Sequence, residues 1–199
     1  MSRRRTALCT LVLLTTIAAS ACTAQGSPSP SAGRDNNPAP GSSAAKLPPR
    51  PKDIPATSID ACKVFGKDQL KTLGLDSEPR KATNGADRFG NQGCIVSKVG
   101  GDPYFNYLVI PVPQEGVDAW LKGDRDSDIK QVTVSGFGAV RAHPNGTSGL
   151  ACSVVVDIAD GQSLNVQFTA GTPKSFDQEQ LCDRARQGAE LAMRTLTQG

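Results

Sequence analysis

The residues with the most distinctive chemistry in this 199-residue chain are its six cysteines. Cys22 follows an apolar segment directly, and a set of four lies farther along the chain: Cys62, Cys94, Cys152 and Cys182. Neighbours within this set are about 30 residues or more apart, unlike the closely spaced ligand pairs of a zinc site. The chain also has one histidine, so we expect no metal and no cofactor. Four cysteines in an oxidising compartment instead predict two disulfides.

Residues 1–21 have the composition of an export signal. A cationic start, "MSRRR", is followed by an apolar stretch over residues 6–20 that is too short for a stop-transfer helix. The sequence "ASAC" at residues 19–22 resembles the bacterial lipobox, although Ala19 stands where Leu is commonest. The resemblance implies cleavage before Cys22 and attachment of acyl chains such as palmitate to it. An ordinary signal peptide that ends at "ASA" is the alternative.

Residues 22–56 form a predicted disordered linker. They are mostly Ser, Ala, Gly, Pro and Asn, which cannot bury enough apolar surface to offset the entropy of ordering. Two fatty acyl chains at Cys22, with about 0.8 kcal/mol per buried methylene, would hold the protein at the extracytoplasmic face of the cell membrane. Of the 22 basic residues, Arg3, Arg4 and Arg5 leave with the signal, so basic and acidic residues balance. We therefore expect no nucleic-acid partner.

The clearest predicted elements are a hairpin and the last helix. Apolar residues alternate over 152–158 and again over 164–168, with a turn at Asp160-Gly161 between them. Residues 175–196 carry an apolar helical stripe that includes Cys182, and Ser175 and Gln178 have capping-box spacing. A strand cysteine and a helix cysteine that both face the core favour a Cys152–Cys182 bridge, which leaves Cys62 to pair with Cys94.

Residues 57–199 are predicted to form a single α+β domain. Its antiparallel sheet is packed by the long C-terminal helix and one or two shorter helices, with two disulfides. The remaining elements expected are helices near 61–75 and 115–123, a strand after Cys94, and strands at 104–112, 129–134 and 138–142.

Several short motifs together resemble a known family. They are Asp60-Ala61-Cys62 opening a helix, Leu70–Leu75 in the pattern L-x-x-L-G-L, Gly93-Cys94, the Gly136–Val140 turn, and the cysteines in the later strand and helix. In this order they resemble the actinobacterial lipoproteins of domain of unknown function 3558, over about residues 58–197. Ile95 and Val96 stand where that family often has an aromatic residue. The resemblance implies an envelope lipoprotein of undetermined activity and supplies no catalytic residue.

No stretch of the sequence has a complete catalytic motif. Residues 146–150 lack the second glycine of a nucleophile elbow, and His143 is interpreted as a solvated turn residue. Trp120 is interpreted as a partly buried helix anchor. We therefore expect a noncatalytic module that binds an envelope protein or a small ligand through the sheet face or loops opposite the last helix. The alternative is an envelope-polymer hydrolase that uses carboxylates such as Asp157 and Asp160.

The lipid-anchor hypothesis gives the first testable prediction. Cys22→Ala removes the thiol that would be acylated, so the variant should take up no radiolabelled fatty acid and should be lost from the membrane fraction. Metabolic labelling of wild type and variant measures this. An unlabelled wild-type protein would contradict the hypothesis.

Overall fold

A seven-stranded antiparallel sheet is the framework of the protein, seen in a computed structural model that describes residues 46–146 and 149–198. The predictions for residues 1–21 and Cys22 lie outside these residues. Strand order across the sheet is β1-β2-β3-β7-β6-β5-β4. The strands are β1 (Arg80–Lys81), β2 (Cys94–Lys98), β3 (Phe105–Val112), β4 (Ser127–Val134), β5 (Phe137–Pro144), β6 (Ala151–Ala159) and β7 (Gln162–Ala170).

The chain crosses from one half of the sheet to the other between β3 and β4. Strands β4 to β7 then form a meander that returns toward the middle, so that β7 pairs with both β3 and β6. The predicted hairpin is β6–β7, and its turn contains Gly161 at a φ of +65°. Such a turn suits glycine because side chains disfavour positive φ.

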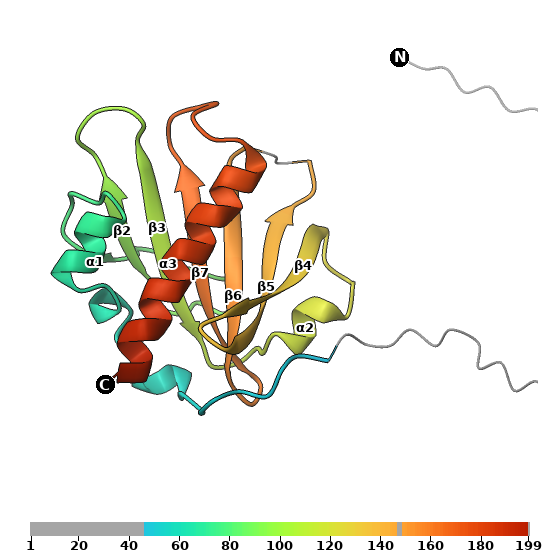
Figure 1. Cartoon of the computed structure of the whole chain (residues 1–199). Coiled ribbons are helices and arrows are strands. Elements are labelled where there is room, and N and C mark those ends of the chain that lie inside the picture. Colours follow the sequence, from blue (N-terminus) through green and yellow to red (C-terminus); the bar gives the residue numbers. More distant parts are fainter. Residues whose placement is uncertain (1–45, 147–148, 199) are drawn as a thin grey trace, which may run out of the picture. The chain divides into compact units, whose positions relative to one another are not determined.

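Helix α3 (Gln178–Gln198) lies diagonally across one face of the sheet, in front of β6 and β7 (Figure 1). Its predicted apolar stripe is buried from Leu181 to Met193. The capping box, however, lies at Asp177 and Gln180 and not at Ser175 and Gln178. The Asp177 carboxylate accepts from the Gln180 backbone N–H at 2.8 Å, and the Gln180 side chain accepts from the Asp177 N–H at 2.9 Å.

An aromatic contact lies beside the cap at the start of α3. Phe176 lies just before the cap, and its ring centroid is 5.3 Å from the ring centroid of Phe168 on β7. A hydrophobic residue in this position often packs against the first turn of the helix. Ser175 is left in the preceding turn, where its hydroxyl donates to the carbonyl of Thr172.

Both predicted disulfides are confirmed. Cys152–Cys182 joins β6 to α3, and Cys62–Cys94 joins the short 3-10 helix η2 (Ala61–Lys63) to β2. The linked cysteines are 30 and 32 residues apart in sequence. Loops of that length contribute roughly 3–4 kcal/mol each in the chain-entropy model.

Two short helices lie on opposite faces of the sheet. Helix α1 (Lys67–Thr72) is on the α3 side, where the Gln69 amide donates to the carbonyl of Leu191 at 3.1 Å. Helix α2 (Asp118–Leu121) is on the other side, and its residues pack with Val140 and Val155. No helix within the described residues combines the length and apolar character needed to cross a membrane. The predicted α+β class is confirmed.

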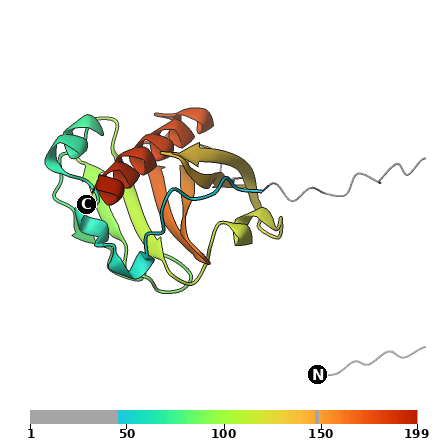
Figure 2. The same cartoon turned by 60° about the horizontal axis from the view of Figure 1, so that its bottom comes forward.

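The described part of the predicted linker, residues 46–56, is folded onto the domain, which differs from the predicted boundary at residue 57. This strap, as we call residues 46–56, runs across the strand ends that lie at the bottom of Figure 1 and that Figure 2 turns toward the viewer. The Ile54 backbone N–H donates to the carbonyl of Ile158 at 2.7 Å, and Ile54 is buried. Leu47 lies against Gly138 on β5, where any side chain would collide with it. The Pro-rich composition predicted disorder, but a few apolar residues suffice to fix the strap.

Candidate functional site

The sheet face opposite α3, here called the back face, carries polar residues in its centre. Strand β7 alternates, so Leu164, Val166 and Phe168 are buried in the core under α3, and the intervening residues face the other way. Those residues are Ser163, Asn165 and Gln167. Because β7 is bonded on both sides, these three lie in the middle of the sheet and not at its edge.

A cavity of about 260 Å³ lies over this part of the back face. The loop containing Arg88 and Phe89 borders it, as do α2 and the segment that follows α2. We call it the back-face cavity, and its polar and aromatic lining includes Arg88, Phe89, Trp120, Arg125, Asn165 and Gln167. A side pocket of about 90 Å³ shares Trp120 and Gln167 with it and reaches His143.

Glu115 organises the charged part of the back-face cavity. Its carboxylate is 9% exposed and accepts from Arg88 through one oxygen and from Arg125 through the other, the latter at 2.5 Å. The Arg125 guanidinium also stacks on the Trp120 ring, 4.0 Å from its centroid. The Ser163 hydroxyl donates to the Glu115 backbone carbonyl at 2.7 Å. These contacts fix the segment after β3 to the centre of the sheet.

Three buried side-chain polar atoms have no hydrogen-bond partner within residues 46–146 and 149–198: Arg125 Nε, His143 Nδ1 and Asn165 Oδ1. All three belong to residues that line the back-face cavity or the side pocket. An unpaired buried polar group costs about 1–3 kcal/mol. Such a group in a native protein calls for an explanation. Arg125 and Asn165 line the same cavity, whereas alternation along β5 places the His143 side chain on the α3 face with Arg141, which pairs with Glu179.

Asn165 is in a position where stability alone would favour an apolar side chain. In the sheet register it lies directly between Ile110 on β3 and Val155 on β6. Both of these neighbours are buried. An amide placed between two aliphatic residues gains neither packing nor, here, a partner for its oxygen.

A second cleft, of about 870 Å³, lies between the strap and α2. In it the Arg50 guanidinium donates to Asp157 and to Asp53, each at 2.8 Å. Burial raises the pKa of Asp157, the hydrogen bond from Arg50 opposes this, and the charges of Asp118 and Asp53 add to the rise. The carboxylates of Asp157 and Asp53 hold Arg50, and their hydrogen bonds raise the pKa of Arg50 above its usual value. This pairing fixes the strap to the end of β6.

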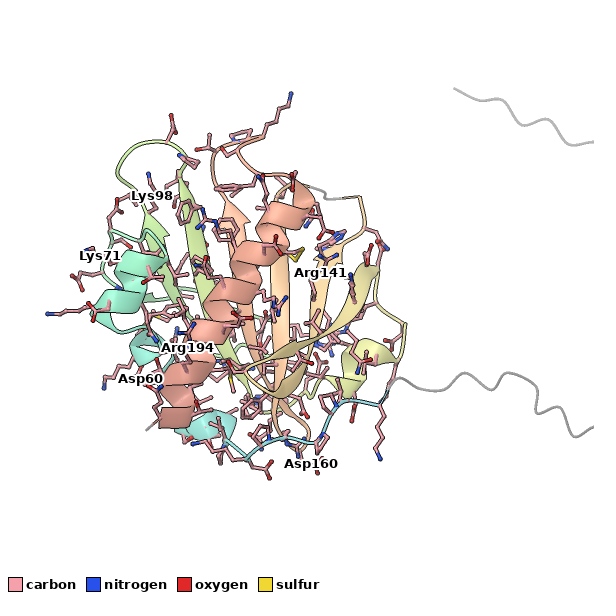
Figure 3. The ribbon with its side chains drawn as sticks, viewed as in Figure 1. Asp60, Lys71, Lys98, Arg141, Asp160 and Arg194 are labelled. Carbon is pink, nitrogen blue, oxygen red and sulfur yellow. A yellow bond between two sulfur atoms is a disulfide. The ribbon has the colours of Figure 1, made fainter. Side chains whose placement is uncertain are left out.

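The residues named in the sequence analysis are not all brought together. Asp160 is exposed in the β6–β7 turn, at the lower end of the sheet in Figure 3, and it is not among the charges that shift the pKa of Asp157. The interpretation of His143 as a solvated turn residue is wrong. It lies in β5 with its side chain 16% exposed, because the strand continues to Pro144. Residues 147 and 148 of the incomplete nucleophile elbow lie outside the described residues.

Trp120 packs against the Val140–Val155 cluster, in agreement with its interpretation as a helix anchor, and also lines both cavities. The sequence analysis missed Glu115, Arg88 and Arg125. Sequence periodicity gives no signal for these three residues because they lie in loops. In the part of the chain that the structure describes, no three His, Cys, Asp or Glu side chains are grouped to hold a metal ion.

The chain belongs to a family described as protein of unknown function (DUF3558), whose profile matches residues 17–195. No curated protein and no solved structure is significantly similar to it. Family membership therefore agrees with the resemblance found in the sequence and assigns no activity to the back face.

The Glu115 cluster predicts unequal roles for its two arginines. The Arg125 side chain is 21% exposed and that of Arg88 is 62% exposed. Arg125→Gln should lower the free energy of unfolding by about 1–3 kcal/mol, because a buried carboxylate loses its buried partner. Arg88→Gln should cost less than about 1 kcal/mol, as exposed ion pairs do. Urea denaturation of both variants measures this, and equal losses would contradict the geometry.

The strap predicts a pH-dependent effect. A raised pKa means that Asp157 holds its proton more tightly in the folded chain than in the unfolded chain. This group therefore lowers stability as the pH rises from the unfolded pKa to the folded pKa. Arg50→Gln removes the contact that opposes the shift. Its loss of melting temperature should therefore be larger near pH 7 than near pH 4. Adding Asp157→Asn to Arg50→Gln should abolish this pH dependence, and an equal loss at both pH values in the single variant would contradict the assignment.

Proposed function

We propose that the protein is a lipid-anchored, extracytoplasmic lipoprotein of the actinobacterial cell envelope that binds a ligand without catalysis. In this proposal residues 1–21 are the lipoprotein signal, Cys22 carries the lipid, and the linker leads to the strap. The domain's ligand site is the back-face cavity.

The proposal depends mainly on the unpartnered atoms of Arg125 and Asn165, two residues that line the same cavity on the back face. A ligand that rearranges the site and supplies hydrogen bonds to these atoms would recover free energy that the empty protein forgoes. The two disulfides and the strap support the role of a binding module, because they keep the surrounding sheet rigid.

The hydrolase alternative has less support. A glycosidase needs two carboxyl groups on either side of a bond, one of them free to give up a proton. Asp157 is hydrogen-bonded to Arg50, and Asp160 is exposed in a turn. The carboxylates whose charges raise the pKa of Asp157 are Asp118 and Asp53, and both line the same cleft as Arg50.

Site-specific photocrosslinking in cells that produce the full chain tests the proposed site. A benzophenone amino acid at Phe89, which is 39% exposed and borders the cavity, should give a discrete adduct with an envelope component. The matched control is Tyr104, an aromatic residue that is 38% exposed and borders none of the cavities described above.

The adduct should form from position 89, be absent from position 104, and disappear when Asn165→Val is added. Adducts of equal yield from both positions would contradict the site. Turnover of an envelope polymer by the purified protein, abolished by Asp157→Asn, would contradict the noncatalytic function.

A further inference from the structure

We propose that the back-face cavity binds a single neutral sugar ring. This inference rests on the proposed function, because it names the ligand class of the same site. The source of the ring is either a free monosaccharide or the end of an envelope polysaccharide, and the two share the chemistry argued below.

The size of the cavity limits the ligand to about one ring. Its volume of about 260 Å³ is just below the range of roughly 300–1,000 Å³ that holds drug-sized ligands. The side pocket of about 90 Å³ beyond Trp120 leaves room for one substituent. A folded peptide or a second protein domain would therefore not enter this site.

The formal charges around the cavity favour a neutral ligand. Arg88 and Arg125 are balanced by Glu115 and by Asp87, which also borders the cavity. Asp87 is held in its own loop, where its carboxylate accepts from the backbone N–H groups of Phe89 and Asn91 at 3.0 Å. An anion placed here would meet two fixed carboxylates, and a cation would meet two guanidinium groups.

The remaining polar groups of the lining include both hydrogen-bond donors and acceptors, which favours a ligand with hydroxyl groups. Arg125 Nε–H and Asn165 Oδ1 have no partner and are buried beneath the cavity surface, so a ligand reaches them only when these side chains shift, while Gln167 borders both cavities. A hydroxyl group donates and accepts at once, whereas a carboxylate only accepts. Adjacent hydroxyls on a rigid ring can therefore serve a guanidinium and an amide oxygen together.

The apolar part of the lining suits the C–H face of such a ring. Ile110, Val112 and Val155 contribute aliphatic surface from the sheet, and Phe89 and Trp120 contribute aromatic surface. A ligand with polar edges and an apolar face matches this mixture, because pockets that orient small ligands combine apolar walls with a few placed polar groups.

Intrinsic fluorescence tests the inference directly, because Trp120 is the only tryptophan in the chain and lines the cavity. The full-length protein is titrated with glucose, galactose, mannose, arabinose and N-acetylglucosamine. At least one of these should give a saturable change, with a Kd on the order of 1 mM for so small a ligand. Glucuronate, which adds a carboxylate to the same ring, should bind at least tenfold more weakly than glucose if glucose is the sugar that binds.

Asn165→Val should weaken sugar binding at least tenfold, because it removes the unpaired amide. The control Asn106→Val changes the same residue type on the back face of β3, outside both cavities, and should leave binding unchanged. Circular dichroism confirms that both variants are folded. Tighter binding by oligosaccharides released from the envelope than by the monosaccharides would identify a polysaccharide end as the source.

The result that overturns the inference is a saturable response to glucuronate but to no neutral sugar, or no response to any sugar. The proposed function fails separately. If the Phe89 crosslink forms while sugars do not bind, the cavity is a ligand site and the ligand class is wrong. If neither is observed, both proposals are wrong.

Discussion

The pairing of β7 on both of its edges is the constraint on which the rest of the structure depends. Hydrogen bonds to β3 and β6 fix the register of this strand, so each of its side chains is assigned to one face of the sheet. One set forms the centre of the core under α3. The other set, with half-buried Asn165 in its middle, is held on the back face between aliphatic neighbours. The polar centre of the back face is therefore a direct consequence of the core.

Covalent and polar ties keep that sheet in place from both sides. Cys152–Cys182 fastens α3 to β6 on the core side, and Arg50–Asp157 fastens the strap to the end of the same strand. The ion pair of Arg141 with Glu179 adds a link from β5 to the first turn of α3, near the Arg141 label in Figure 3. Among the described residues, the back face is covered by α2, by Leu47 of the strap and by loops, and not by a helix as long as α3. This asymmetry leaves room there for a ligand.

Much of the fold could be predicted from the sequence because it depends on local periodicity. The alternation in β6 and β7 and the apolar stripe of α3 placed Cys152 and Cys182 on facing surfaces, which was enough to pair all four cysteines. The start of α3 could not be predicted in the same way, because Ser175–Gln178 and Asp177–Gln180 have the same capping-box spacing. Phe176 also packs against Phe105 on β3, a strand distant in sequence. The site was missed for a similar reason: Glu115, Arg88 and Arg125 come from separate loops. Period-two alternation also cannot tell a solvent-facing polar residue from one in a covered cavity.

We propose that the polar groups of the back face are kept for binding and not for stability. The free energy of unfolding of Asn165→Val, measured by urea denaturation without ligand, tests it most directly. Valine would complete the aliphatic row from Ile110 to Val155 and remove an unpaired amide oxygen. The variant should be more stable than wild type by about 1 kcal/mol. A loss of stability of similar size would mean that Asn165 supports the fold, and it would contradict the claim.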